Sequence, residues 1–247
     1  MSLFYAVSWK GILKVIFWGL FENKNDEIAF NYSKVSLYFK EASKKSINES
    51  NPTVWNCKTL ESKPWHDQRS YIRDILENNA ERIISDFQLI KSSIKTHPDN
   101  SSLTPKGKWS GLFFSGINGW DNRILRKCPN IAEVLKKLPI CQNFGFAMLS
   151  GTEANTIISP HCGSSNLRLR HHLSVYVPEP KAVKIRVGDE WRYWQQGKTM
   201  VFDDSFEHEV IHEGKMLRVI LSVDTWHPSL TSEEIKILSH PVFKDFG

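Results

Sequence analysis

The second half of the sequence alternates between apolar and polar side chains in four short segments, and this pattern most constrains the fold. Apolar side chains occupy every second position in residues 173–177, 183–187, 200–202 and 217–223. A period of two places them on one face of a β-strand. Pro, Gly and Asp residues, which are typical of turns, separate the segments. Short strands at this spacing predict a double-stranded β-helix, the jelly roll in which two sheets face each other.

Helical periodicity precedes this region. Six apolar side chains recur at steps of three, four and seven residues: Ile72, Ile75, Leu76, Ile83, Phe87 and Ile90. They predict one amphipathic helix with Asp67 as its N-cap, and a shorter helix is predicted at 131–138. Residues 96–107, rich in Pro, Ser, Asn and Lys, predict a long surface loop. The predicted fold class is therefore mainly β, a cupin-like jelly roll with flanking α-helices on its N-terminal side.

Length, charge and cysteine content bound the kind of protein. A chain of 247 residues favours one domain with decorations. The net charge of +5 and the pI near 8.9 are mildly basic, but the lysines are dispersed, so we expect no nucleic-acid partner. The four cysteines form no CxxC pair and are interpreted as reduced thiols. A reducing, cytoplasmic location follows.

The N-terminal segment leaves two interpretations open. Residues 1–21 are largely apolar, but Lys10 and Lys14 interrupt them, and the apolar part at 15–20 is too short to span a bilayer. Both lysines share one helical face, as in a helix that lies in a membrane interface. The preferred alternative is a helix packed on the rest of the chain. We therefore divide the chain into an N-terminal apolar helix with an irregular extension, residues 1–59, and a domain at 60–247 whose jelly-roll core spans about 109–228.

Two histidines and one arginine point to the chemistry. His161 lies in a Pro-His-x-Gly turn, His208 follows 47 residues later, and Arg218 stands ten residues beyond it in a strand-like segment. We expect the first histidine near the start of one core strand and the second near the end of a later strand. Imidazoles from two strands hold iron(II), and a guanidinium binds the far carboxylate of 2-oxoglutarate. The three residues fit an iron(II) oxygenase that uses 2-oxoglutarate.

The carboxylate that completes the usual iron site is missing. It normally stands two residues after the first histidine, where this chain has Gly163. Two histidines could hold iron alone with water in the gap, or a halide could fill the gap, as in iron halogenases. A third interpretation is that the His-x-Gly segment has no relation to a metal.

The segment 160–228 resembles the aspartyl/asparaginyl β-hydroxylase family, and weaker similarity extends the resemblance to about 60–230. Three segments carry it: PHCGSSNLRLRHHL, GDEWRYWQQGKTMVFDDSFEHEV and LRVILSVDTWHP. The resemblance implies a jelly-roll hydroxylase that uses Fe(II), 2-oxoglutarate and O2, with iron on two histidines. The glycine at 163 then agrees with the family pattern.

The resemblance also assigns roles by motif position. His161 and His208 would be the iron ligands, and Arg218 would bind the distal carboxylate of 2-oxoglutarate. Arg170 and His172 would contact the cosubstrate from the strand after the first ligand.

Three further positions are less sharply defined. Arg168, on the same strand face as Arg170, is a candidate for binding a substrate carboxylate. A family serine that assists cosubstrate binding falls at Ser150 when counted without gaps, or at Ala147 if the strands are aligned instead. His212 would share a face with His208, and it is the main competitor as a ligand.

The resemblance implies insertion of one oxygen atom at an unactivated carbon of an Asp- or Asn-type residue. That residue would belong to a peptide, a protein or a small amino-acid-derived precursor. The alternatives are an acyl-chain hydroxylase of the lipid A type at a membrane surface, which residues 1–21 would contact, and a non-catalytic cupin-like binding protein.

Overall fold

The structure of the chain is a computed structural model, and it describes residues 46–57, 59–116 and 118–240. The apolar segment expected to form a helix at residues 1–21 lies outside the described residues. Within the described ranges, no helix combines the length and the apolar character needed to cross a bilayer.

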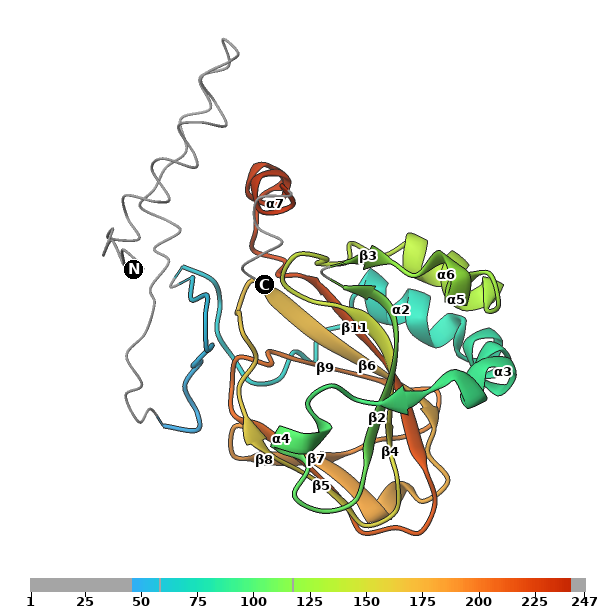
Figure 1. Cartoon of the computed structure of the whole chain (residues 1–247). Coiled ribbons are helices and arrows are strands. Elements are labelled where there is room, and N and C mark those ends of the chain that lie inside the picture. The colour runs from blue at the N-terminus through green and yellow to red at the C-terminus, as the bar shows by residue number, and fades with distance from the viewer. Residues whose placement is uncertain (1–45, 58, 117, 241–247) are drawn as a thin grey trace, which may run out of the picture. The chain divides into compact units, whose positions relative to one another are not determined.

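The larger of two antiparallel sheets has seven strands in the described part of the chain, in the order β1-β2-β4-β11-β6-β9, with β3 beside β2 (Figure 1). Its strands are β1 (Lys95–Thr96), β2 (Trp109–Gly116), β3 (Gly119–Trp120), β4 (Ala147–Thr152), β6 (Arg168–Tyr176), β9 (Thr199–Phe202) and β11 (Arg218–Trp226).

The smaller sheet has four strands in the order β5-β10-β7-β8, again counted over the described residues. Its strands are β5 (Thr156–His161), β7 (Val183–Val187), β8 (Glu190–Tyr193) and β10 (His208–His212). Ile158, Ile185 and Val210 of this sheet pack in one buried cluster with Phe202 and Ile220 of the larger sheet. The two sheets therefore face each other, which confirms the predicted jelly roll.

Helices cover the other face of the larger sheet. They are α2 (Tyr71–Asn78), α3 (Ala80–Ile90), α5 (Asn122–Leu125) and α6 (Pro129–Lys136). The described residues also form α7 (Ser232–Leu238), the 3₁₀ turns η1 (Lys91–Ser93) and η2 (Pro180–Ala182), and α4 (Asn100–Leu103), which contacts β5. Ile83 and Phe87 of α3 and Ile131 of α6 share a core with Leu173 and Leu221 of the sheet. The predicted flanking helices are thus confirmed.

Alternation along the central strands separates the core from the space between the sheets. In β6, Leu173 and Val175 belong to the helix-side core. Arg168, Arg170 and His172, which alternate with apolar neighbours, point to the other face and line a cavity. The strand pattern therefore delivers three polar side chains to the interior of the jelly roll.

Two helix predictions were wrong in detail. The apolar repeat of residues 72–90 forms two helices, because Asn79 leaves helical geometry at φ −108° and ψ 10°. Ser70, not Asp67, caps α2 by accepting a hydrogen bond from the Arg73 amide. The Asp67 carboxylate instead pairs with Arg192. The predicted loop at 96–107 likewise contains the short helix α4.

Residues 51–57 pack against the segment that follows β5. Trp55, which is buried, forms a parallel bridge with Ser165. The Asn166 side chain accepts a hydrogen bond from the Cys57 amide and donates one to the Cys57 carbonyl. The division of the chain at residue 59 stays a prediction.

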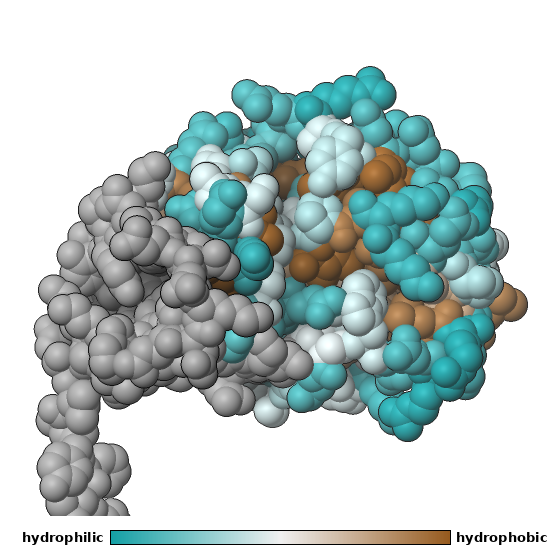
Figure 2. All heavy atoms as spheres, turned by 90° about the horizontal axis from the view of Figure 1, so that it is seen from above, coloured by the Kyte–Doolittle hydropathy of each residue, from teal (hydrophilic) through white to brown (hydrophobic). Residues whose placement is uncertain are grey.

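Figure 2 looks onto the end of the described part of the chain at which β3 lies in Figure 1. Hydrophobic residues gather at a hollow in the middle of this face, and hydrophilic residues surround them (Figure 2). Apolar surface is therefore open at this end of the jelly roll.

Candidate active site

A cavity of about 420 Å³ lies between the two sheets. The seven residues that sequence reasoning selected all line it: Ser150, His161, Arg168, Arg170, His172, His208 and Arg218. They come from five strands, so the fold brings together side chains that are up to 68 positions apart in the chain, as the contact between Ser150 and Arg218 shows.

His161 and His208 are direct partners across two antiparallel strands. His161 ends β5 and His208 begins β10, and the two residues pair in the strand register. Their ring centroids lie 4.2 Å apart. The expected placement, with the first histidine near the start of a strand and the second near the end, was therefore wrong, although the two imidazoles do meet.

Backbone contacts leave the same nitrogen of each imidazole available. His161 Nδ1 lies 2.7 Å from the Ser159 carbonyl, and His208 Nδ1 lies 2.9 Å from the Phe206 carbonyl. A carbonyl accepts a hydrogen, so both rings carry their proton on Nδ1 and keep the Nε2 lone pair free. Burial lowers the pKa of both imidazoles, and the two rings are neutral at pH 7. Neutral imidazoles with a free nitrogen are the donors that iron(II) takes.

Arg218 is a buried cation without a carboxylate. Its side chain is 2 % exposed, and among the described residues it forms no ion pair. Nη1 donates to the Ser150 carbonyl over 3.4 Å, and the guanidinium stands over the Trp194 ring, 4.3 Å from the centroid. Burial lowers the pKa of Arg218 to about 9, so it remains charged at pH 7. An uncompensated guanidinium on a cavity wall is a binding site for an anion.

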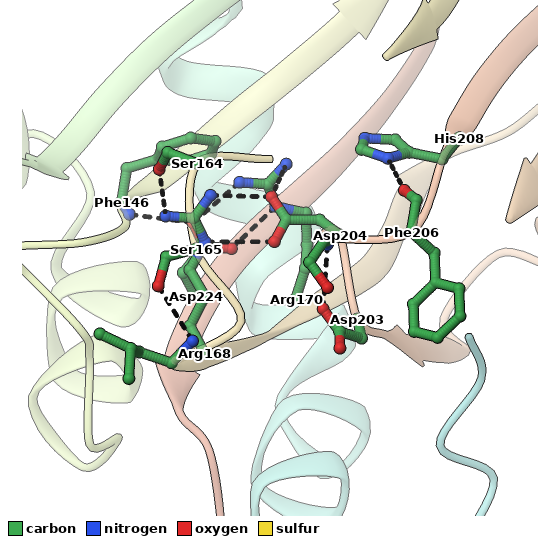
Figure 3. A network of polar contacts seen from close by, with 12 residues as sticks. Phe146, Ser164, Ser165, Arg168, Arg170, Asp203, Asp204, Phe206, His208 and Asp224 are labelled. Carbon is green, nitrogen blue, oxygen red and sulfur yellow. Dashed lines mark hydrogen bonds and ion pairs between the residues drawn. The ribbon is translucent and has the colours of Figure 1, made fainter. Parts of the chain in front are cut away.

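Arg168 and Arg170 differ from Arg218 because they belong to a four-charge network with Asp204 and Asp224 (Figure 3). Arg170 forms two hydrogen bonds with Asp224, of 2.8 and 2.9 Å, and lies 3.0 Å from Asp204. Arg168 donates to Asp204 over 2.8 Å and lies 3.4 Å from Asp224. Both carboxylates are fully buried, and the two positive and two negative charges balance.

The network also controls the protonation of Asp204. Burial alone would raise the pKa of this carboxyl group, but the guanidiniums of Arg168 and Arg170 hold the pKa below its ordinary value. Asp204 is therefore ionised. The roles predicted for Arg168 in substrate binding and for Arg170 in cosubstrate binding stay predictions, and both guanidiniums already carry carboxylate partners.

Gly163 leaves room for this network. Its amide donates to the Asp204 carbonyl over 2.6 Å. A Cβ atom at position 163 would overlap the carboxylate of Asp204. The space that a ligand carboxylate at 163 would need is therefore filled by Asp204.

Ser150 and Ala147 lie on opposite faces of β4. Ser150 faces the cavity, where its hydroxyl accepts a hydrogen bond of 2.9 Å from Trp109 Nε1. Ala147 belongs to the helix-side core. The geometry thus favours Ser150 over Ala147 as the position that a cosubstrate could contact, and its role stays a prediction.

His212 does not line the cavity. It ends β10, where it pairs with Thr156 and Val183, at the far end from His208. Sequence reasoning missed Asp224, which holds Arg170. Its place as an acidic residue inside an otherwise apolar strand was the available signal.

The comparisons with known proteins agree with the family resemblance. Residues 75–228 match the family described as Aspartyl/Asparaginyl beta-hydroxylase, which is more than half of the chain. The chain belongs to this hydroxylase family.

Three relatives show how far the similarity reaches. Mouse "Aspartyl/asparaginyl beta-hydroxylase" is 31% identical over 195 residues, which cover 75% of this chain and 26% of the relative. Human "Aspartate beta-hydroxylase domain-containing protein 2" is 31% identical over 203 residues, which cover 76% of this chain and 53% of the relative. "Ornithine lipid ester-linked acyl 2-hydroxylase" of Rhizobium tropici is 30% identical over 187 residues, which cover 72% of this chain and 62% of the relative. The chain thus spans about a quarter to about three fifths of these relatives.

Solved structures with a similar fold include a prolyl-4-hydroxylase from Pseudomonas putida, with a TM-score of 0.39 and 8% identity over 67% of this chain and 94% of that one. A collagen prolyl hydroxylase from Paramecium Bursaria Chlorella virus-1 has a TM-score of 0.35 and 8% identity, over 57% of this chain and 91% of that one.

Proposed function

We propose that the protein is an iron(II)- and 2-oxoglutarate-dependent hydroxylase that inserts one oxygen atom at an unactivated carbon. The observation that carries the proposal is the pairing of two neutral imidazoles with an uncompensated guanidinium in one cavity. His161 and His208 would hold the metal, and Arg218 would bind the distal carboxylate of 2-oxoglutarate.

The chain's own contribution is positioning and exclusion of water. Backbone carbonyls fix the tautomer of both imidazoles, so each ring meets the metal with the same nitrogen. Burial of Arg218 strengthens its attraction for a carboxylate, because little water competes for it. Ser150, whose hydroxyl is held by Trp109, would contact the cosubstrate beside Arg218, and His172 would do so from β6.

The chemistry supplied by bound iron(II) and 2-oxoglutarate is the reduction of dioxygen, which places one oxygen atom in a substrate C–H bond and the other in succinate.

Succinate release tests this proposal. The full chain, supplied with iron(II), 2-oxoglutarate and O2, is expected to form succinate, and His161→Ala and His208→Ala are expected to lower the rate by more than about 100-fold. His212→Gln is the matched control, because this buried histidine of the same strand lies outside the cavity. Binding of Mn(II), followed by electron paramagnetic resonance, gives a second readout that needs no turnover. Unchanged Mn(II) binding in both alanine variants would exclude the assigned ligands.

Two substrate classes follow from the relatives. The family name and the mouse relative support an Asp- or Asn-type residue of a peptide, protein or small precursor. The Rhizobium tropici relative, of which the chain covers 62%, supports an acyl chain. A gain of one oxygen atom in mass, measured on an Asp-containing peptide and on an acyl lipid in parallel, separates the two.

A further inference from the structure

A second, larger cavity of about 850 Å³ opens beside the one that holds the histidines. We call it the outer cavity and the first one the inner cavity. Phe146, Ser164 and Arg168 line both. The outer volume lies in the range of about 300–1,000 Å³ that is typical of ligand sites. A molecule held there would reach the inner cavity past Phe146.

Five aromatic side chains line the outer cavity, together with polar residues such as Asn118, Asn122 and Gln142. Phe113, Phe114, Trp120, Phe144 and Phe146 line it, and Phe113 packs edge-on against Phe146 with ring centroids 5.6 Å apart. These residues come from β2, β3 and the segment before β4, at the end of the molecule where apolar surface is open in Figure 2. Such walls favour an apolar ligand.

The buried polar groups of these walls are mostly engaged by the protein. The Asn143 amide donates to the carbonyls of Leu238 and His240, over 2.8 and 3.1 Å. Arg168 is paired with Asp204, and Ser115 contributes one buried hydroxyl. A peptide that reached this buried part of the cavity would bury amide groups with few partners, at a free-energy cost for each, because the amide side chains of Asn118, Asn122 and Gln142 are more exposed. An alkyl chain carries no such groups.

The rim carries positive charge. Arg123 and Arg126 line the cavity, and both are exposed. Asp121 is the acidic residue among the described lining residues; its carboxylate accepts hydrogen bonds from the amides of Arg123 and Ile124 and lies 3.6 Å from Nε of Arg123. Arg126 has no ion pair in the described ranges. Because Asp121 compensates Arg123, Arg126 supplies the net positive charge of the rim, and this charge is complementary to an anionic group.

We propose that the outer cavity binds an acyl chain that carries an anionic group, and that Phe146 sets how far the chain reaches toward the inner cavity. The proposal rests on the proposed hydroxylase function and selects the acyl-chain class of substrate. Phe146 can act as a fixed partition, because its amide donates to Asp224 over 3.2 Å and the Arg170 guanidinium stands 4.5 Å from its ring centroid.

Fluorescence of cis-parinaric acid tests the site without turnover. The full chain is titrated with this anionic polyene fatty acid, which is then displaced by laurate, by dodecanol or by an acidic peptide. The dissociation constant of laurate, obtained from displacement of the probe, is expected to be at least about 5-fold lower than that of dodecanol. The peptide is expected not to displace the probe. Arg126→Ala is expected to weaken the binding of laurate about 5-fold and to leave the binding of dodecanol unchanged.

Two comparisons guard against nonspecific binding. Trp191→Ala removes an exposed aromatic side chain of β8 that lines neither cavity, and it is expected to change nothing. Phe146→Ala and the milder Phe146→Leu are expected to extend the chain length at which affinity stops rising, measured with fatty acids of 8 to 16 carbons. Thermal unfolding of each variant confirms that it is folded.

Several results would overturn the proposal: no binding of the probe, displacement by the peptide but not by laurate, equal losses in Arg126→Ala and Trp191→Ala, or an unchanged chain-length limit in both Phe146 variants. Because the titration needs neither iron nor 2-oxoglutarate, its failure would leave succinate release untouched, and absence of succinate would leave the binding result untouched.

Discussion

Two arginines of the inner cavity show how one residue type can serve opposite purposes. Arg170 is compensated by Asp224 and Asp204, whereas Arg218 has no acidic partner in the described ranges. A buried unpaired charge destabilises the folded state, and a buried charge pair destabilises it when one member is removed. Removal of the charge at Arg218 should therefore stabilise the folded state, whereas removal of the charge at Arg170 should destabilise it.

Replacement of each arginine with methionine is expected to separate stability from activity. Arg218→Met should raise the free energy of unfolding by about 1–2 kcal/mol while it abolishes saturation by 2-oxoglutarate. Arg170→Met should lower it by about 3–5 kcal/mol, because the buried network then holds two carboxylates and one guanidinium, and Asp224 keeps only its 3.4 Å contact with Arg168. Chemical denaturation and the KM for 2-oxoglutarate measure both effects. A loss of stability in Arg218→Met would show that the buried, unpaired guanidinium does not destabilise the fold.

At the scale of elements, the segment after β5 is fitted to the segment between β9 and β10, which precedes the second histidine. Gly163 donates its amide to Asp204, and its missing side chain makes room for the Asp204 carboxylate. Asp204 in turn pairs with Arg168 and Arg170 of β6. The glycine and the charge network therefore form one unit.

Restoring a carboxylate at position 163 is expected to harm the protein. Gly163→Asp must displace Asp204 from its arginines, so it should lower the free energy of unfolding by about 3 kcal/mol and reduce succinate formation. Gly163→Ala should show a smaller loss. Thermal unfolding compared with succinate release checks this expectation. Full activity in Gly163→Asp would contradict it.

Alternation along strands made much of the site predictable. It placed Arg168 and Arg170 on one face of β6, and the motif spacing brought His161 and His208 to one cavity. The alternation could not give the acidic partner of each arginine. That partner depends on the register between β6 and β11, whose paired residues are more than fifty positions apart in the chain, as for Arg170 and Asp224. The break at Asn79 was equally hidden, since both halves of the helix keep an apolar face.

At the scale of the whole molecule, buried histidines link stability to pH. Burial lowers the pKa of His66 to about 4 and that of His171 to about 3. Lys63 and His227 lower the first further while Glu61 raises it, and Arg73 and His66 lower the second. Both imidazoles are therefore neutral in the folded chain. In the unfolded chain a histidine has a pKa near 6.5.

The free energy of unfolding is expected to fall as the pH drops below 6.5. Above this pH both states are neutral, whereas below it the unfolded chain binds protons that the folded chain does not bind until about pH 4. Two such groups contribute a slope of about 3 kcal/mol per pH unit between pH 6 and pH 4.5. His171→Gln should remove about half of this contribution. Chemical denaturation at a series of pH values in this range measures the slope. An unchanged slope in His171→Gln would contradict the lowered pKa of His171.

Strand β11 carries Arg218 at one end and Asp224 near the other, on the same face. Six residues of extended backbone separate them, about 20 Å at the usual rise per residue. One strand therefore fixes the distance between the proposed binding residue for the cosubstrate and the charged cluster beside the outer cavity. Changes in the surrounding loops can reshape the entrance while this span keeps its length.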